Sequence, residues 1–183
     1  MTRPVRHTVT SLQRKLDAGA LTGDWTLDPT RSTAKLRGRH MWGLAPVNGY
    51  FRVLTGNGRV SPAGDVTGSI ALAAESVDTK NAMRDGHLRG ADFFMAEKYP
   101  QITFSLETLV PGDDSATISG TLTVRDTSRR ISFPATVILS GDGEAELDAK
   151  VEVDRSEYGI TVNHLGMVKM DCSVTLHAVF TKE

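Results

Sequence analysis

The chain has 183 residues, of which 39% are hydrophobic and 23% are charged, and its formal net charge is −1. This length suits one domain with its own core, and the charge gives no electrostatic case for binding nucleic acid. Cys172 is the single cysteine, so an internal disulfide is excluded, and lone thiols are commonest in reducing compartments. Residues 1–24 contain no apolar run of signal-peptide length, and no stretch approaches the about 20 apolar residues of a membrane span. We therefore expect a cytoplasmic protein without a transmembrane segment.

The first 24 residues are predicted to be an N-terminal extension with a short amphipathic helix. Between residues 8 and 20 the apolar positions are Val9, Leu12, Leu16 and Ala20, and this spacing is typical of a narrow helical stripe. We favour a helix packed on the domain. A membrane-surface anchor is the alternative, because basic residues are frequent here, although the bulky Trp or Phe of such anchors is missing.

From Trp25 onward apolar and polar residues alternate, which indicates half-buried strands joined in antiparallel order. About eight such runs follow one another up to residue 183. Several have about 9 residues or more, above the usual ~5–6, and long antiparallel strands are easiest to protect in a closed barrel. We predict an all-β, up-and-down barrel of about eight strands over residues 25–183, with a β-sandwich as the alternative.

One long segment, residues 76–104, lacks this alternation. Asn81 is a suitable cap for a helix over Met83 to Arg89, which Gly90 would end. Asp92 is a suitable cap for a second short helix carrying Phe93, Phe94 and Met95, which Tyr99-Pro100 would stop. Two short helices inside a β protein predict a flap over one end of the barrel.

The inward faces of the strands carry many small residues, namely Ala34, Gly38, Gly49, Gly68, Ala116, Gly120, Ala135, Ala145, Ala149 and Ala178. An eight-stranded barrel has an interior that bulky side chains just fill. Smaller side chains leave space, and an apolar space holds an apolar ligand more readily than water. Composition alone leaves a second interpretation open, in which glycines mark strand bends and the helices fill the interior.

No motif indicates a metal site or a catalytic nucleophile. The five histidines form no spaced cluster and Cys172 has no partner cysteine; only a composite of His40 and His87, closed by the flap, would bring two of them together. Arg84, Asp85 and Asp92 are interpreted as an Arg–Asp pair and helix caps. The alternative places Arg84 at the polar end of a ligand.

The motifs of the flap are Arg84-Asp85-Gly86-His87-Leu88, Asp92-Phe93-Phe94, Tyr99-Pro100 and Ile102-Thr103-Phe104. Gly120-Thr121-Leu122-Thr123-Val124-Arg125 and the pair of Arg155 with Tyr158-Gly159-Ile160 follow later. In this order, and across residues 25–183, they resemble the YceI-like family of lipocalin-like β-barrel proteins associated with polyisoprenoid lipids. Arg31 and Gly38 depart from the family pattern, which leaves the length of the lipid tail and the pocket shape open.

The resemblance implies a binding or carrier protein that holds a polyprenyl or quinone-type chain inside the barrel and needs no other cofactor. It also leads us to expect a homodimer and is compatible with transient contact with a membrane surface. The residues that we expect to contact the lipid are Leu36, His40, Phe51, Ile70, Arg84, His87, Phe93, Phe94, Phe104, Leu106, Ile118, Leu122, Phe133, Val151, Tyr158 and Met170. Two alternatives stay open: an enzyme acting on an isoprenoid with His40 as general base, and a protein that works through its surface.

Overall fold

The computed structural model describes residues 11–40, 45–52, 54–112, 115–162 and 170–183. The helical elements are α1 (Ser11–Asp17), η1 (Ala74–Ser76), α2 (Ala82–Arg89) and η2 (Arg155–Tyr158). The strands are β1 (Gly23–Leu27), β2 (Thr33–His40), β3 (Ala45–Phe51), β4 (Leu54–Val60), β5 (Val66–Ala73), β6 (Val77–Asp78), β7 (Gln101–Pro111), β8 (Ala116–Val124), β9 (Thr127–Ser140), β10 (Glu144–Asp154) and β11 (Asp171–Lys182).

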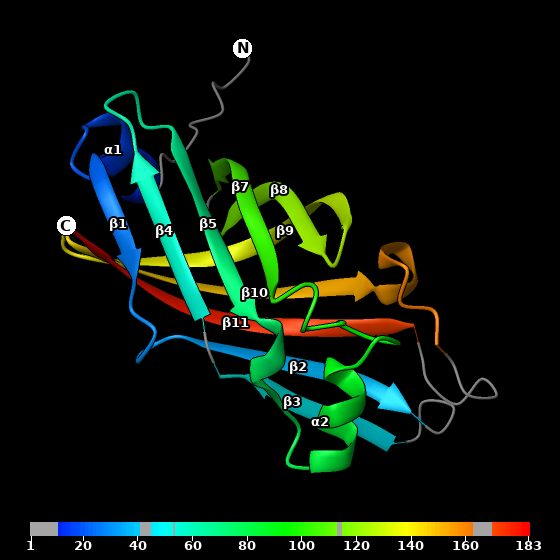
Figure 1. The fold of residues 1–183 in the computed structure, drawn as a ribbon. Helices are drawn as coiled ribbons and strands as arrows, with labels where there is room; N and C mark the ends of the chain where they lie inside the picture. The colour runs from blue at the N-terminus through cyan, green and yellow to red at the C-terminus, as the bar shows by residue number, and fades with distance from the viewer. Residues whose placement is uncertain (1–10, 41–44, 53, 113–114, 163–169) are drawn as a thin grey trace.

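These strands form a closed antiparallel barrel, as the alternation predicts (Figure 1). The hydrogen-bonded order is β1-β4-β5-β7-β8-β9-β10-β11, and β1 also pairs with β11, which closes the ring of eight. Strands β2, β3 and β6 continue from β11 along the same sheet. Both β1 and β2 pair with β11, so they act as two halves of one long barrel strand interrupted between residues 28 and 32.

The register follows the predicted faces. Leu36 is half-buried while Lys35 and Arg37 are exposed, and Ile118 is buried while Thr117 is exposed. Since side chains alternate between the two faces of a strand, these positions confirm that the predicted apolar set points inward. Strand β7 departs from simple alternation: a bulge between Leu106 and Thr108 shifts its pairing with β8.

Helix α1 packs across one end of the barrel. Leu16 and Leu21 are buried there in one cluster with Trp25 and Val60. The helix lies close to the turn before β5, where Gly64 has φ +87° and an added Cβ would meet the Leu16 carbonyl oxygen at 3.3 Å. Only glycine suits such a position. The packed helix is thus confirmed for its described part, while residues 8–10 of the prediction lie outside the described residues.

Helix α2 lies at the opposite end of the barrel from α1 (Figure 1). As predicted, the Asn81 side chain caps it by accepting a hydrogen bond from the Arg84 N–H, and Gly90 ends it. The predicted second helix over Phe93 to Met95 is wrong, because this segment forms turns. The N–H groups of Phe94, Met95 and Ala96 donate to the carbonyls of Leu88, Gly90 and Arg89, respectively. The chain therefore folds back on the C-terminal end of α2, whose last carbonyls need partners.

Candidate functional site

The barrel contains an apolar cavity of about 740 Å³ between its strands and the flap, which consists of α2 and the turns that follow it up to Tyr99. Leu36 of β2, Phe51 of β3, Leu122 of β8 and Val151 of β10 form part of its wall, and Phe94 of the flap covers it. A volume of this size is within the range of small-molecule pockets, which are mostly apolar with a few polar groups. The cavity is therefore the candidate ligand site of the described chain.

Small residues on the inward faces help to create this space. Gly38 belongs to the wall, and a Cβ added there would meet no atom of the described residues within 4 Å. Gly120 has a different role, because an added Cβ would come within 2.2 Å of the Ser105 carbonyl oxygen and 2.7 Å of the Phe104 ring. Glycine on β8 thus lets the Phe104 ring lie against the strand itself. Of the two interpretations from composition, the one with an internal space is supported by the structure.

A second, smaller cavity of about 140 Å³ lies between the first cavity and the α1 end. Its wall includes Leu16 and Trp25 from the α1 cluster together with Ile118 and Leu106. The two cavities share the wall residues Ile70, Phe104, Phe133 and Leu176. The rings of Phe104 and Phe133 pack with centroids 5.3 Å apart and a 54° tilt. This aromatic pair therefore forms part of the partition between the two cavities.

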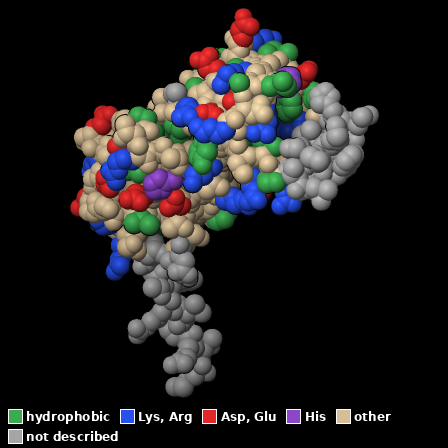
Figure 2. Space-filling view, turned by 90° about the horizontal axis from the view of Figure 1, so that it is seen from below, with side chains coloured by type: hydrophobic (Ala, Val, Ile, Leu, Met, Phe, Trp, Pro, Cys, Tyr) green, Lys and Arg blue, Asp and Glu red, His purple; other side chains and the backbone are tan. Residues whose placement is uncertain are grey.

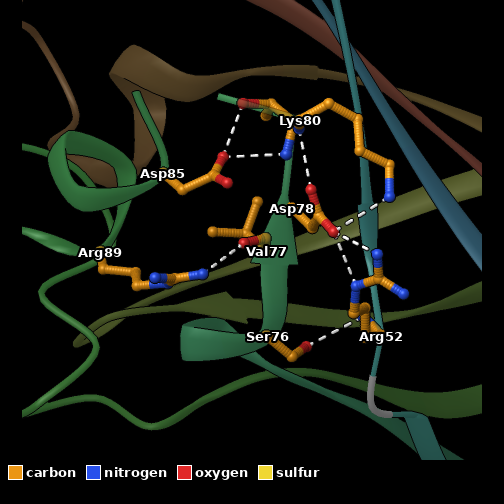
Figure 3. A network of polar contacts seen from close by, with 8 residues as sticks. Arg52, Ser76, Val77, Asp78, Lys80, Asp85 and Arg89 are labelled. Carbon is orange, nitrogen blue, oxygen red and sulfur yellow. Dashed lines mark hydrogen bonds and ion pairs between the residues drawn. The ribbon is translucent and has the colours of Figure 1, made fainter. Parts of the chain in front are cut away.

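Hydrogen bonds to Thr79 fix helix α2 next to β6, and Figure 3 shows Asp85 of this network. The buried carboxylate of Asp85 accepts from the Thr79 N–H at 2.8 Å and from the Thr79 hydroxyl at 2.6 Å. The Arg84 guanidinium donates to Thr79 Oγ1 and to the Thr79 carbonyl oxygen. Asp85 and Arg84 are therefore structural residues linked through Thr79, and not the direct Arg–Asp pair that the sequence predicts. Asp92, the other predicted cap, is exposed and begins no helix.

Further contacts tie the flap to the edge strand β6 (Figure 3). Arg89 donates to the Val77 carbonyl oxygen at 2.8 Å. Asp78 accepts from the Lys80 N–H at 2.8 Å and from Arg52 Nε at 2.7 Å. These two donors, the Lys80 backbone first, lower the pKa of Asp78 from 3.8 to about 2. The base of the flap is therefore anchored to β6 and to Arg52 after β3, whereas Phe93 and Phe94 line the cavity.

The short helix η2 closes another part of the wall. Asp154 caps it by accepting from the Ser156 N–H, and Gly159 follows it with φ +72°. The buried guanidinium of Arg155 donates to the carbonyls of Ile160 and Val162 and lies 5.4 Å from the centroid of the Phe93 ring. Burial lowers the pKa of Arg155. Its hydrogen bonds hold η2 to the following loop, and its cation–π contact with Phe93 links η2 to the flap.

Most residues predicted to contact a ligand lie on the wall of the main cavity, namely Leu36, Phe51, Ile70, Arg84, His87, Phe93, Phe94, Phe104, Leu122, Phe133, Val151 and Tyr158. Leu106 and Ile118 line the smaller cavity instead. Met170 is half-buried but belongs to neither wall. The side chain of His40 lies outside what the structure describes. The binding role of all these residues stays a prediction.

Sequence reasoning missed several wall residues, including Val47, Leu88, Ile131, Val153, Arg155, Ile160 and Cys172. Val153 could have been predicted, because it lies two residues after Val151 on β10 and its side chain therefore points to the same face. Arg155 belongs to a motif that the sequence singled out, but its position beneath the flap depends on long-range packing. No local pattern reports that packing.

The thiol on the cavity wall is not activated as a nucleophile. Burial raises the pKa of the Cys172 thiol to about 11, so the thiolate is scarce at neutral pH. Among the described residues, no group of three or more His, Cys, Asp or Glu side chains is placed to hold a metal ion. Within the same ranges, no helix combines the length and apolarity needed to cross a bilayer.

Basic side chains are frequent on the outer surface near the flap. Lys35, Arg37 and Arg39 are exposed on β2, and Arg39 also contributes to the cavity wall. Figure 2 shows the molecule from below, with Lys and Arg side chains over the middle of this face and acidic side chains interspersed among them. A charged part of a ligand would meet basic groups here, whereas the interior is apolar.

The model of the YceI-like domain matches residues 25–180. The chain belongs to the YceI-like family. Curated YceI-like relatives include Protein YceI of Escherichia coli O157:H7, 38% identical over 45% of this chain and 42% of the relative. Protein YceI of Salmonella arizonae is 29% identical over 52% of each chain. The chain thus aligns with only about half of the length of these relatives.

Solved structures share the YceI-like fold of this chain. BcnA of Burkholderia cenocepacia has a TM-score of 0.75 at 21% identity, covering 84% of this chain and 98% of that one. A polyisoprenoid binding domain from Saccharophagus degradans has a TM-score of 0.71 at 17% identity, covering 87% and 98%. The YCEI protein of Campylobacter jejuni has a TM-score of 0.68 at 23% identity, covering 76% and 87%. These similarities confirm the lipocalin-like barrel predicted from the sequence.

Proposed function

We propose that this protein binds and carries a long apolar lipid of the isoprenoid type inside its barrel. The observation that carries the proposal is the apolar cavity of about 740 Å³, walled by the inward faces of the strands and covered by the flap. Membership of the YceI-like family and the solved polyisoprenoid binding domain from S. degradans support an isoprenoid as the ligand class.

The physical basis of binding would be the burial of a hydrocarbon chain. At about 25 cal/mol per Å², a few hundred Å² of buried chain contributes several kcal/mol before the costs of ordering the ligand. Such a wall selects for apolarity and shape more than for individual polar atoms. A flexible, branched polyprenyl chain fits this requirement.

Organic extraction of the purified protein followed by mass spectrometry tests the proposal directly. We expect a polyprenyl or prenylquinone species at a stoichiometric level. Absence of such a species, together with no uptake of an added prenyl lipid, would contradict the proposal. Conversion of the lipid during incubation would instead favour an enzyme, the alternative for which the described residues supply no particular observation.

Gly38 provides a variant that adds volume to the cavity wall at a position where a Cβ has room among the described residues. A leucine there would project into the open space beside Leu36. We expect Gly38→Leu to weaken lipid binding by at least about tenfold, since it takes space that the ligand needs, and to leave the free energy of unfolding within about 1 kcal/mol of the wild type. Gly143→Leu is the matched control, because an added Cβ there likewise meets none of the atoms that the structure describes within 4 Å, and Gly143 is not on the cavity wall.

Cys172 supplies the readout for this comparison. It is the only cysteine of the chain and belongs to the cavity wall. A bound lipid should slow its alkylation by a small thiol reagent at pH 9 in the wild type and in Gly143→Leu, and much less in Gly38→Leu. Equal protection in all three forms would mean that the lipid does not need the space beside Gly38, and no protection in the wild type would place the lipid outside this cavity. The expected cytoplasmic location and homodimer stay predictions that this assay does not address.

A further inference from the structure

Strand β2 carries three cations in a row on the outer face of the barrel. Lys35, Arg37 and Arg39 alternate with residues that line the cavity, and the side chains of all three are exposed. Alternate residues of a strand lie about 7 Å apart on one face. Strand β2 and helix α2 occupy the lower side of the molecule in Figure 1, which is the side that Figure 2 shows. These three residues form the β2 strip.

The β2 strip has neutral neighbours on both adjacent strands. The residues that pair with its positions are Thr175 and Ser173 on β11 and Tyr50, Asn48 and Pro46 on β3. Exposed cations on other strands face carboxylates instead, as in the ion pairs Arg59–Asp24 and Arg130–Glu107. The strip therefore lacks the cross-strand neutralisation that these other cations have.

The acidic residues on the neighbouring strands bind other cations. Asp78 of β6 is paired with Arg52 and Lys80, and Glu152 of β10 is paired with Lys150. Within the described part of the chain, no ion pair joins a cation of the β2 strip to a carboxylate. Like charges on one face of a sheet repel one another and lower stability. An anionic partner outside the chain would remove this repulsion.

Exposed apolar side chains and the rim of the cavity adjoin the β2 strip. Tyr50 is 44% exposed directly across from Lys35, and Met83 is 76% exposed on α2. Arg39 and Arg84 belong to the wall of the main cavity. Cationic groups next to exposed apolar ones are typical of a surface that contacts a membrane. A long apolar lipid is poorly soluble in water, so it exchanges most readily where the cavity rim touches a bilayer.

We propose that the β2 strip docks the protein on the surface of an anionic phospholipid bilayer, with Tyr50 and Met83 against that surface and the ligand passing between bilayer and cavity beside the flap. Each Lys or Arg close to such a surface strengthens binding severalfold. The proposal rests on the proposed function for the passage of the ligand, whereas the docking itself can be measured on the lipid-free protein.

The test is co-sedimentation of the full-length, lipid-free protein with vesicles of phosphatidylcholine alone or with about 30% phosphatidylglycerol. It is run at about 0.1 M salt and at about 1 M salt, where the screening length falls to about 3 Å. Lys35→Gln/Arg37→Gln removes two cations of the strip, neither of which is on the cavity wall. Arg59→Gln/Arg130→Gln is the matched control, because these side chains are 73% and 70% exposed and lie on β4 and β9.

We expect the wild type and the control to prefer anionic over neutral vesicles at least about tenfold at low salt, and to lose this preference at high salt. Lys35→Gln/Arg37→Gln should bind anionic vesicles about tenfold or more weakly than the control. Transfer of geranylgeraniol from these vesicles to the variant should slow accordingly. Its affinity for the lipid, measured by Cys172 protection, should be unchanged, and its unfolding midpoint should be unchanged or higher.

Equal vesicle binding by the two double variants, or no preference for anionic vesicles in the wild type, would overturn the proposal. A clearly lower unfolding midpoint of Lys35→Gln/Arg37→Gln would also overturn it, because the cations would then serve the fold. Retention of the wild type on heparin without binding to anionic vesicles would assign the strip to another polyanion, with the same consequence. Vesicle binding that depends on the strip, without uptake of the lipid by any form, would uphold the docking and overturn the proposed function alone.

Discussion

Asp78 is the residue at which pH should act on the base of the flap. Its carboxylate accepts from the Lys80 N–H and from Arg52, which lower its pKa from 3.8 to about 2. A carboxyl with a depressed folded-state pKa stabilises the fold above its unfolded pKa, and this contribution is lost as pH falls. We therefore expect the stability that Asp78 provides to be fully present above pH 4 and to disappear as pH falls toward 2.

Asp78→Asn tests this dependence. The variant should be less stable than the wild type at pH 6, and the difference should shrink between pH 4 and pH 2 because the wild-type carboxylate becomes protonated there. Chemical denaturation at a series of pH values measures it. Glu97→Gln, which removes an exposed carboxylate from the same flap, controls for the loss of one negative charge. A difference between wild type and Asp78→Asn that stays constant down to pH 2 would contradict this role of Asp78.

At the scale of elements, the sequence predicts what depends on local periodicity and misses what depends on contacts across the barrel. The strand faces and the cap of α2 by Asn81 follow directly from residue order. The turn over Phe93 to Met95 does not, because the end of α2 supplies carbonyl partners that only folding brings close. The β7 bulge could not be predicted from the sequence either. Leu106 and Leu109 pack against the same apolar cluster although they are three residues apart, because the register of β7 against β8 shifts between Leu106 and Thr108.

The same limit applies to the candidate site. Apolar wall residues such as Leu36 and Val151 could be predicted because alternation decides which face they occupy. The contact of Arg155 with Phe93 could not, because η2 and the flap are far apart in the sequence. The sequence alone also left open whether the small side chains on the inward strand faces create an internal space or whether the helices fill that space. Only the packing of whole elements decides that question.

The flap element should act as a lid. Phe93 is half-buried with its ring against the Arg155 guanidinium, whereas Phe94 packs against Phe51 with ring centroids 5.7 Å apart. We expect Phe93→Ala to have a larger effect on the lipid off-rate, which should rise, than on the free energy of unfolding, which should fall only modestly. Its cost in unfolding free energy should stay below the about 3–5 kcal/mol of a fully buried aromatic.

Phe51→Ala is the matched control, because Phe51 is 3% exposed and belongs to the main core cluster. It should show the full stability loss of about 3–5 kcal/mol. Stopped-flow transfer of lipid to acceptor vesicles measures the off-rate, and denaturant titration of the lipid-free forms measures stability. A large stability loss in Phe93→Ala with an unchanged off-rate would mean that Phe93 is core and not lid.

At the scale of the whole molecule, the barrel is covered differently at its two ends. At one end, Leu16 of α1 and Leu21 after the helix are buried in one cluster with Trp25, beside the small cavity of about 140 Å³. The flap covers the other end through aromatic contacts and hydrogen bonds at its base, above the large cavity. A long ligand would therefore enter on the flap side, and its far end would approach the partition between the cavities.

The partition formed by Phe104 and Phe133 should limit the length of the lipid chain that fits in the main cavity. Phe133 and Phe104 belong to the walls of both cavities, so removing the Phe133 ring should connect them. We expect Phe133→Ala to shift the affinity maximum in a series of prenyl alcohols toward longer chains, at a stability cost of at most about 3–5 kcal/mol. Ile138→Ala, which truncates a 50% exposed residue on the outer face of the same strand, should leave the preferred length unchanged. An unchanged length preference in a folded Phe133→Ala variant would show that the lipid chain ends before it reaches the Phe104–Phe133 pair. The Phe133 ring would then border space that the lipid does not occupy.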